Sequence, residues 1–66
     1  MQITLNGQPR QVADGATVAD LLEELNLSTR HVAVEVNVEL VPRPKHAGHH
    51  LAEGDRVEVV TLVGGG

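Results

Sequence analysis

The sequence predicts an α+β domain in which one helix covers one face of a sheet of four or five strands. Apolar and polar residues alternate near both ends of the 66-residue chain, a pattern typical of half-buried strands. Between these ends, one segment repeats its apolar residues at helical spacing. A chain of this length forms a single domain. Because one helix covers only one sheet face, we expect two layers.

The first 13 residues predict a hairpin. Residues 1–5 alternate between apolar and polar side chains, which indicates a strand. Asn6-Gly7 follows, and this pair tolerates the positive φ angles of a tight turn. Residues 8–13 are the expected returning strand. Pro9 cannot donate a ladder hydrogen bond, so this strand belongs at a sheet edge.

A helix is predicted over residues 18–25. Thr17 is the expected N-cap, and Asp20 completes a capping-box pattern three residues later. Asn26 is the expected stop, because asparagine accepts the left-handed conformation. The apolar stripe repeats at helical spacing and consists of Val18, Leu21, Leu22 and Leu25.

The second half of the chain predicts three further strands. Residues 32–37 alternate, residues 40–41 form a short apolar pair before a proline, and residues 56–63 follow a glycine-containing turn. Residues 43–50 show no period and contain a proline and three histidines. We therefore interpret this segment as irregular and solvated.

The last strand carries apolar residues on both of its faces. Val57 and Val59 alternate with Glu58, but the same register places Val60 and Leu62 on the glutamate side. Either the strand is central and covered on both sides, or Val60 and Leu62 form an exposed partner-docking patch.

Composition excludes several classes of function. The formal net charge of −4 argues against nucleic acid as the partner, because phosphate binding needs a basic face. The chain has no cysteine, which excludes disulfides and a thiolate nucleophile. No apolar stretch approaches the ~20 residues that a membrane helix needs. The chain also lacks a signal-peptide pattern, a catalytic triad and a phosphate-binding loop. We expect a cytoplasmic protein that is monomeric when free and is not an enzyme.

Four histidines are the only group that suggests a metal site. His46, His49 and His50 lie on the expected irregular loop, and His31 lies outside it. Tight metal sites place their ligands on rigid elements and hold each ligand in place with a further hydrogen bond. We therefore predict no metal site and a solvated loop.

Residues 17–25, 32–37, 41–43, 53–59 and 64–66 form five blocks. In this order they resemble the ThiS family, the sulfur carriers of thiamine biosynthesis, which have a ubiquitin-like β-grasp fold. The sequence departs from the family pattern in having three terminal glycines instead of two, and in carrying His46 where an aromatic residue often stands. The resemblance implies a β-grasp domain over residues 1–63, a flexible tail over 64–66, and parallel pairing of the first and last strands near the sheet centre.

The resemblance also implies a chemistry for the tail. The carboxylate of Gly66 is expected to be adenylated by an E1-like enzyme that uses ATP, and then converted to a thiocarboxylate. A persulfide-bearing protein supplies the sulfur and thiazole synthase receives it. Gly64 and Gly65 are expected to thread into the partner's active site. The chain itself then holds no permanent cofactor and no catalytic residue.

Physical reasoning about the glycines leaves two interpretations of the tail. Three successive glycines pack no side chain and lose much entropy when they are ordered, so they do not stabilise the domain. They form either a thin thread for a narrow channel or a frayed terminus. Other functions also stay open: related carriers serve molybdopterin synthesis or tRNA thiolation, and a β-grasp domain can act as a non-covalent interaction module.

Overall fold

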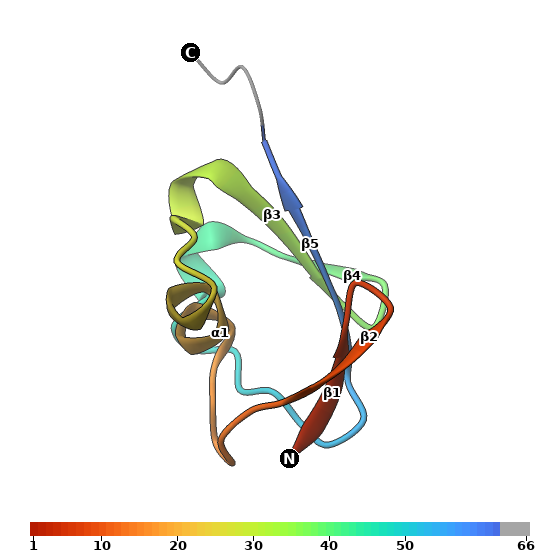
Figure 1. Cartoon of the computed structure of the whole chain (residues 1–66). Helices are drawn as coiled ribbons and strands as arrows, with labels where there is room; N and C mark the ends of the chain where they lie inside the picture. The colour runs from red at the N-terminus through yellow and green to blue at the C-terminus, as the bar shows by residue number, and fades with distance from the viewer. Residues whose placement is uncertain (63–66) are drawn as a thin grey trace.

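The computed structural model describes residues 1–62 as a five-stranded mixed sheet with one α-helix across one face (Figure 1). This is the expected α+β arrangement of a ubiquitin-like β-grasp. Two short 3-10 turns, η1 and η2, lie in the connections. The elements are β1 (Gln2–Leu5), β2 (Gln8–Gln11), α1 (Val18–Glu24), η1 (Thr29–His31), β3 (Val32–Val36), β4 (Glu39–Val41), η2 (Arg43–Lys45) and β5 (Arg56–Thr61).

The sheet places β5 at its centre, in the order β2-β1-β5-β3-β4. β1 and β5 are parallel, with Thr4 opposite Arg56, as the resemblance implies. On the other side β5 pairs antiparallel with β3, from Val32 opposite Thr61 onward. β2, with Pro9, is an edge strand as expected. The strand that leads toward the tail is therefore held by neighbours on both sides.

The predicted capping of α1 is confirmed. The backbone N–H of Asp20 donates to Thr17 Oγ1 at 3.1 Å, and the N–H of Thr17 donates to Asp20 Oδ2 at 3.0 Å. The helix ends at Glu24, with Leu25 as its C-cap, and Asn26 adopts the expected left-handed conformation with φ of 58°. In the described part of the chain, no helix has the length and apolarity that crossing a membrane requires.

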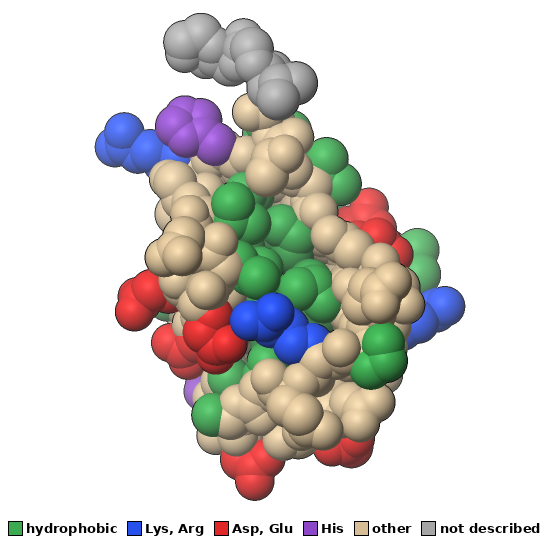
Figure 2. Space-filling view, in the orientation of Figure 1, with side chains coloured by type: hydrophobic (Ala, Val, Ile, Leu, Met, Phe, Trp, Pro, Cys, Tyr) green, Lys and Arg blue, Asp and Glu red, His purple; other side chains and the backbone are tan. Residues whose placement is uncertain are grey.

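The core lies between α1 and the helix side of the sheet. Its buried side chains are apolar, and they come from the helix, the strands and the connections. Part of this layer is visible from outside (Figure 2), because the side chains at its margin are only partly buried. The margin consists of Met1, Leu5, Leu25, Leu27 and Val59, and the core consists of Ile3, Val12, Ala16, Val18, Leu21, Leu22, Val32, Val34, Val36, Val41, Leu51 and Val57.

Several boundaries differ from the sequence-based expectations. β2 ends at Gln11 instead of residue 13, because Val12 turns inward into the core. β5 ends at Thr61, and the end of the predicted strand, residue 63, lies outside the described residues. The segment expected to be irregular begins with the η2 turn, in which the N–H of Lys45 donates to the carbonyl of Pro42 at 2.8 Å.

Candidate functional site

The central strand β5 is the last element before the C-terminal tail. Gly64, Gly65 and Gly66, which the sequence assigns to the reactive tail, lie outside the described residues. Leu62 is the last residue described, and its N–H donates to the carbonyl of His31 at 2.8 Å. The last described residue is thus hydrogen-bonded to the residue that directly precedes β3.

Val60 and Leu62 are both exposed, by 57% and 51%. The antiparallel register aligns Val60 with Ala33, on the sheet face opposite the buried Val57. The strand is central, as the first of the two interpretations holds, but that interpretation is wrong about the covering of both faces, and the exposed pair is correct. Their role as a docking patch stays a prediction.

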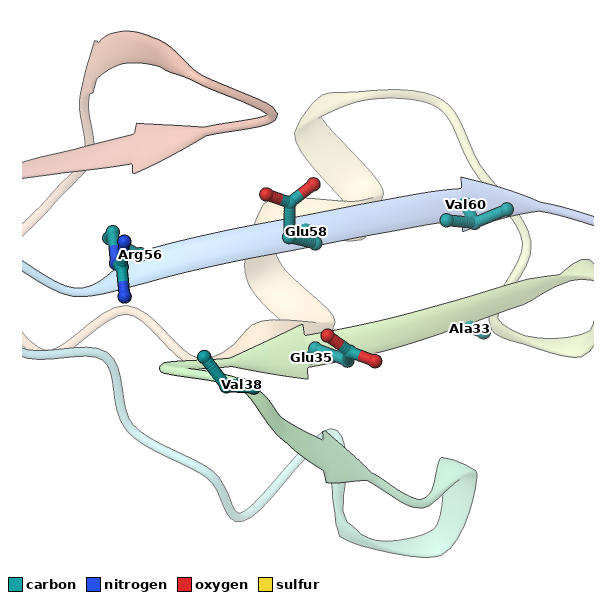
Figure 3. Close-up of a pocket in the computed structure, with 6 residues that line it drawn as sticks. All are labelled: Ala33, Glu35, Val38, Arg56, Glu58 and Val60. Carbon is teal, nitrogen blue, oxygen red and sulfur yellow. The ribbon is translucent and has the colours of Figure 1, made fainter.

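The open sheet face around Val60 forms a shallow hollow (Figure 3). Ala33, Glu35, Val38, Arg56, Glu58 and Val60 line it. Glu35 and Glu58 are directly opposite each other across the β3–β5 ladder, a position in which like charges repel. Within residues 1–62, neither carboxylate takes part in an ion pair. The hollow therefore combines apolar side chains with two carboxylates and the guanidinium of Arg56.

Two further exposed apolar residues were missed at the sequence level. Val38 is 74% exposed and Leu40 is 64% exposed. Val38 follows Asn37 in the two-residue turn between β3 and β4, and both residues have positive φ, 71° for Val38 and 53° for Asn37. A β-branched residue with positive φ is an outlier. A turn of this kind usually carries glycine at the second position, so Asn37 followed by valine is only half of the usual turn signal.

The side chain of Asn6 holds the backbone of β5 at Val59. β1 ends at Leu5, so it does not reach the far end of its neighbour. The side chain of Asn6 continues the pairing, because its Nδ2 donates to the carbonyl of Val59 at 3.1 Å and its Oδ1 accepts from the N–H of Val59 at 2.8 Å. The sequence indicated only a turn residue at this position.

The interpretation of the histidine loop as solvated is wrong for His46, which is only 3% exposed. Its Nε2 lies 2.9 Å from the carbonyl oxygen of Val41, and its Nδ1 contacts the hydroxyl of Thr29. Because a carbonyl only accepts, Nε2 carries a proton and donates it to Val41. The ring of His46 thus belongs to the interior.

The backbone of the same loop caps the helix. The N–H groups of Val18 and Ala19 donate to the carbonyl oxygens of His49 and His46, both at 3.0 Å. Free N–H groups in the first turn of a helix require such partners. Within residues 1–62, no three metal-binding side chains come together. The loop is therefore a structural element of the helix N-terminus.

Comparison with known proteins identifies relatives along nearly the whole chain. The family described as "ThiS family" matches residues 3–66. The sulfur carrier protein ThiS of Escherichia coli is 38% identical over 66 residues, which cover all of both chains. A thiazole synthase of Paramagnetospirillum magneticum is 41% identical over 66 residues, and there the chain spans all of its own length but only 20% of that protein.

A solved structure supports the same relationship. The crystal structure of the thiamine biosynthesis protein ThiS from Geobacter metallireducens aligns with a TM-score of 0.84 and 35% sequence identity. The alignment covers all of both chains. The fold, the length and the sequence therefore agree over one and the same stretch.

Proposed function

The chain belongs to the ThiS family, and on that premise we propose that it is a sulfur carrier of thiamine biosynthesis. The observation that carries the proposal is the family match, which runs through the β-grasp domain and on to Gly66. Two similarities support it: the sulfur carrier of Escherichia coli matches over its full length, and so does the thiamine biosynthesis protein of known structure.

The proposed reacting group is the carboxylate of Gly66. A carboxylate is a poor acyl donor because its leaving group would be oxide. Attack of the carboxylate on the α-phosphorus of ATP releases pyrophosphate and gives an acyl-adenylate. A persulfide sulfur then attacks the carbonyl carbon and AMP leaves. A thiol finally cleaves the sulfur–sulfur bond, which leaves a thiocarboxylate on Gly66 and a disulfide on the donor. In this scheme the chain is a co-substrate, and the partner enzyme binds the ATP.

Thiazole synthase is the proposed acceptor of the sulfur. The relative from Paramagnetospirillum magneticum that bears this name contains a stretch similar to the whole of this chain. A carrier and its acceptor act in succession, so their presence in one polypeptide supports a partnership between them. The E1-like enzyme and the persulfide donor follow from the chemistry of the tail. The cytoplasmic location and the monomeric free state stay predictions.

Val60 and Leu62 are proposed to dock the adenylating enzyme. Both are exposed apolar side chains, and Leu62 directly precedes the last four residues. Four extended residues reach at most roughly 13–14 Å. A partner that holds the carboxylate in its active site must therefore contact the domain close to this pair.

Intact mass and pyrophosphate release test the proposal. Wild type should gain first an adenylate and then a thiocarboxylate when it is incubated with an adenylating enzyme, ATP and a persulfide donor. Deletion of Gly66 shortens the thread by roughly 3.3–3.6 Å, about the distance within which reacting atoms must lie. Addition of one residue moves the carboxylate past the activated phosphate.

Both length variants should stay folded and lose adenylation. If either is adenylated at the wild-type rate, or if wild type is never modified by an adenylating enzyme of its own cell, the carrier function is wrong. A non-covalent interaction module is then the better description. The thermal midpoint of each variant separates a lost reaction from a lost fold.

A further inference from the structure

The end of the molecule from which the tail departs carries a group of basic side chains. Thr29, Arg30, His31, Arg43 and Leu62 line one shallow hollow there. We call Arg30, His31 and Arg43 the basic collar. None of the five lining residues is acidic, although the whole chain carries nine acids against five lysines and arginines. Figure 2 shows histidine and basic side chains at the end where β5 finishes, and acidic side chains at the opposite end.

The collar is built by two separate turns that one buried residue joins. Arg30 and His31 lie on η1, and Arg43 lies on η2. His46 connects the turns, because its ring contacts the hydroxyl of Thr29 in η1 and its N–H donates to the carbonyl of Arg43 at 3.1 Å. Its ring is also hydrogen-bonded to the carbonyl of Val41. The spacing of the basic groups is therefore fixed from inside the fold.

We propose that the basic collar contacts an acidic rim around the opening through which the adenylating enzyme admits the tail. This inference rests on the proposed function. When the tail is extended into that enzyme, the carboxylate of Gly66 lies up to roughly 13–14 Å from Leu62. The collar beside Leu62 then meets the protein surface at the opening and lies too far away to contact the nucleotide at the carboxylate.

The uneven distribution of charge would orient the carrier as it approaches the enzyme. An acidic rim attracts the collar and repels the rest of a chain whose formal net charge is −4. Complementary charge accelerates encounter, and like charge suppresses wrong orientations. The carrier is thus turned so that its tail enters first.

Two exposed positions on the same turn offer a matched test. Arg43 lies in the collar hollow, whereas Lys45, on the same η2 turn, lines other parts of the surface. Arg43→Glu and Lys45→Glu change the net charge equally. We expect Arg43→Glu to raise the KM for the carrier in adenylation about tenfold at low salt and Lys45→Glu to change it less than twofold. Arg30→Glu should behave as Arg43→Glu does.

Three readouts decide the outcome. The effect of Arg43→Glu should shrink at high salt, because the Debye length falls from about 10 Å at 0.1 M to about 3 Å at 1 M, while kcat and the KM for ATP stay unchanged. Equal effects of Arg43→Glu and Lys45→Glu overturn the proposal. A rise in the KM for ATP also overturns it and assigns the collar to the nucleotide.

Binding of the carrier to the adenylating enzyme without ATP separates this proposal from the proposed function. If wild type binds with a salt-sensitive Kd that Arg43→Glu weakens, but is never adenylated, the collar proposal stands and the carrier function fails. If wild type is adenylated and Arg43→Glu binds as tightly as Lys45→Glu, the carrier function stands and the collar proposal fails. Absence of any wild-type binding overturns the collar proposal as well.

Discussion

The two faces of the sheet follow different rules. On the helix side, Val34 and Val57 are fully buried beneath α1, and each obeys the alternation of its strand. On the open side, Val38 is exposed in a strained conformation, and Glu35 faces Glu58 across the ladder. Val60 adds an exposed apolar side chain beside them. The requirement for a buried core explains the residue types on the helix side, but it does not explain those on the open side.

The difference indicates what each face is for. Local choices that oppose stability persist where a site requires them. The strained valine and the paired carboxylates cost stability, and within residues 1–62 neither carboxylate forms an ion pair. We therefore expect a partner, more than the fold, to account for the side chains of the open face.

The largest effect is expected on the covered face. Leu21→Ala should lower the free energy of unfolding by about 2–5 kcal/mol, because Leu21 is fully buried and a cavity remains beneath the helix. Val60→Ala, on the open face, should change it by less than about 0.5 kcal/mol. Urea titration of both variants measures the contrast. Similar losses in the two would mean that the faces do not differ as described.

A smaller effect of opposite sign is expected at the turn between β3 and β4. Val38→Gly should raise the free energy of unfolding by about 1 kcal/mol, because glycine removes the cost of positive φ, about 1–2 kcal/mol, and loses about 0.5–1 kcal/mol of entropy. Val38→Ala is the matched control, since it shortens the side chain and keeps the unfavourable backbone. Equal stability of the two variants would show that the strain is not real.

The smallest effect on stability is expected at Leu62. Leu62→Gln should leave the free energy of unfolding within about 0.5 kcal/mol, because the side chain is half exposed, and should still weaken adenylation. Thermal unfolding and pyrophosphate release measure the two quantities on the same sample. A large loss of stability would place Leu62 in the core and remove it from the docking patch.

Local signals in the sequence were sufficient for much of the fold. The capping box of Thr17 and Asp20, the left-handed Asn26 and the turn at Asn6 depend on neighbours a few residues away, so they could be predicted. The parallel pairing of the first and last strands came from the family resemblance, because periodicity does not specify which strands pair.

Features that depend on distant segments could not be predicted. His46 is buried because Thr29 and Val41 supply hydrogen-bond partners, and neither partner is evident from the sequence around it. The side chain of Asn6 acts as a ladder partner for Val59, which lies at the other end of the chain. The basic collar likewise appears only when η1 and η2 meet. At the site, strand register placed Val60 and Leu62 on the face of Glu58, but it could not decide whether that face is covered, because covering depends on how distant segments pack.

The central position of β5 affects when the sheet can form during synthesis of the chain. β1 and β3 are synthesised first, but both lie against β5, so the sheet closes only once Arg56–Thr61 has left the ribosome. Pairings so distant in sequence form late, and until then both strands keep bare edges that invite aggregation. A chain truncated before β5 lacks the middle of its sheet and is exposed to proteolysis. Completion of the sheet therefore requires the same strand that leads to the glycines.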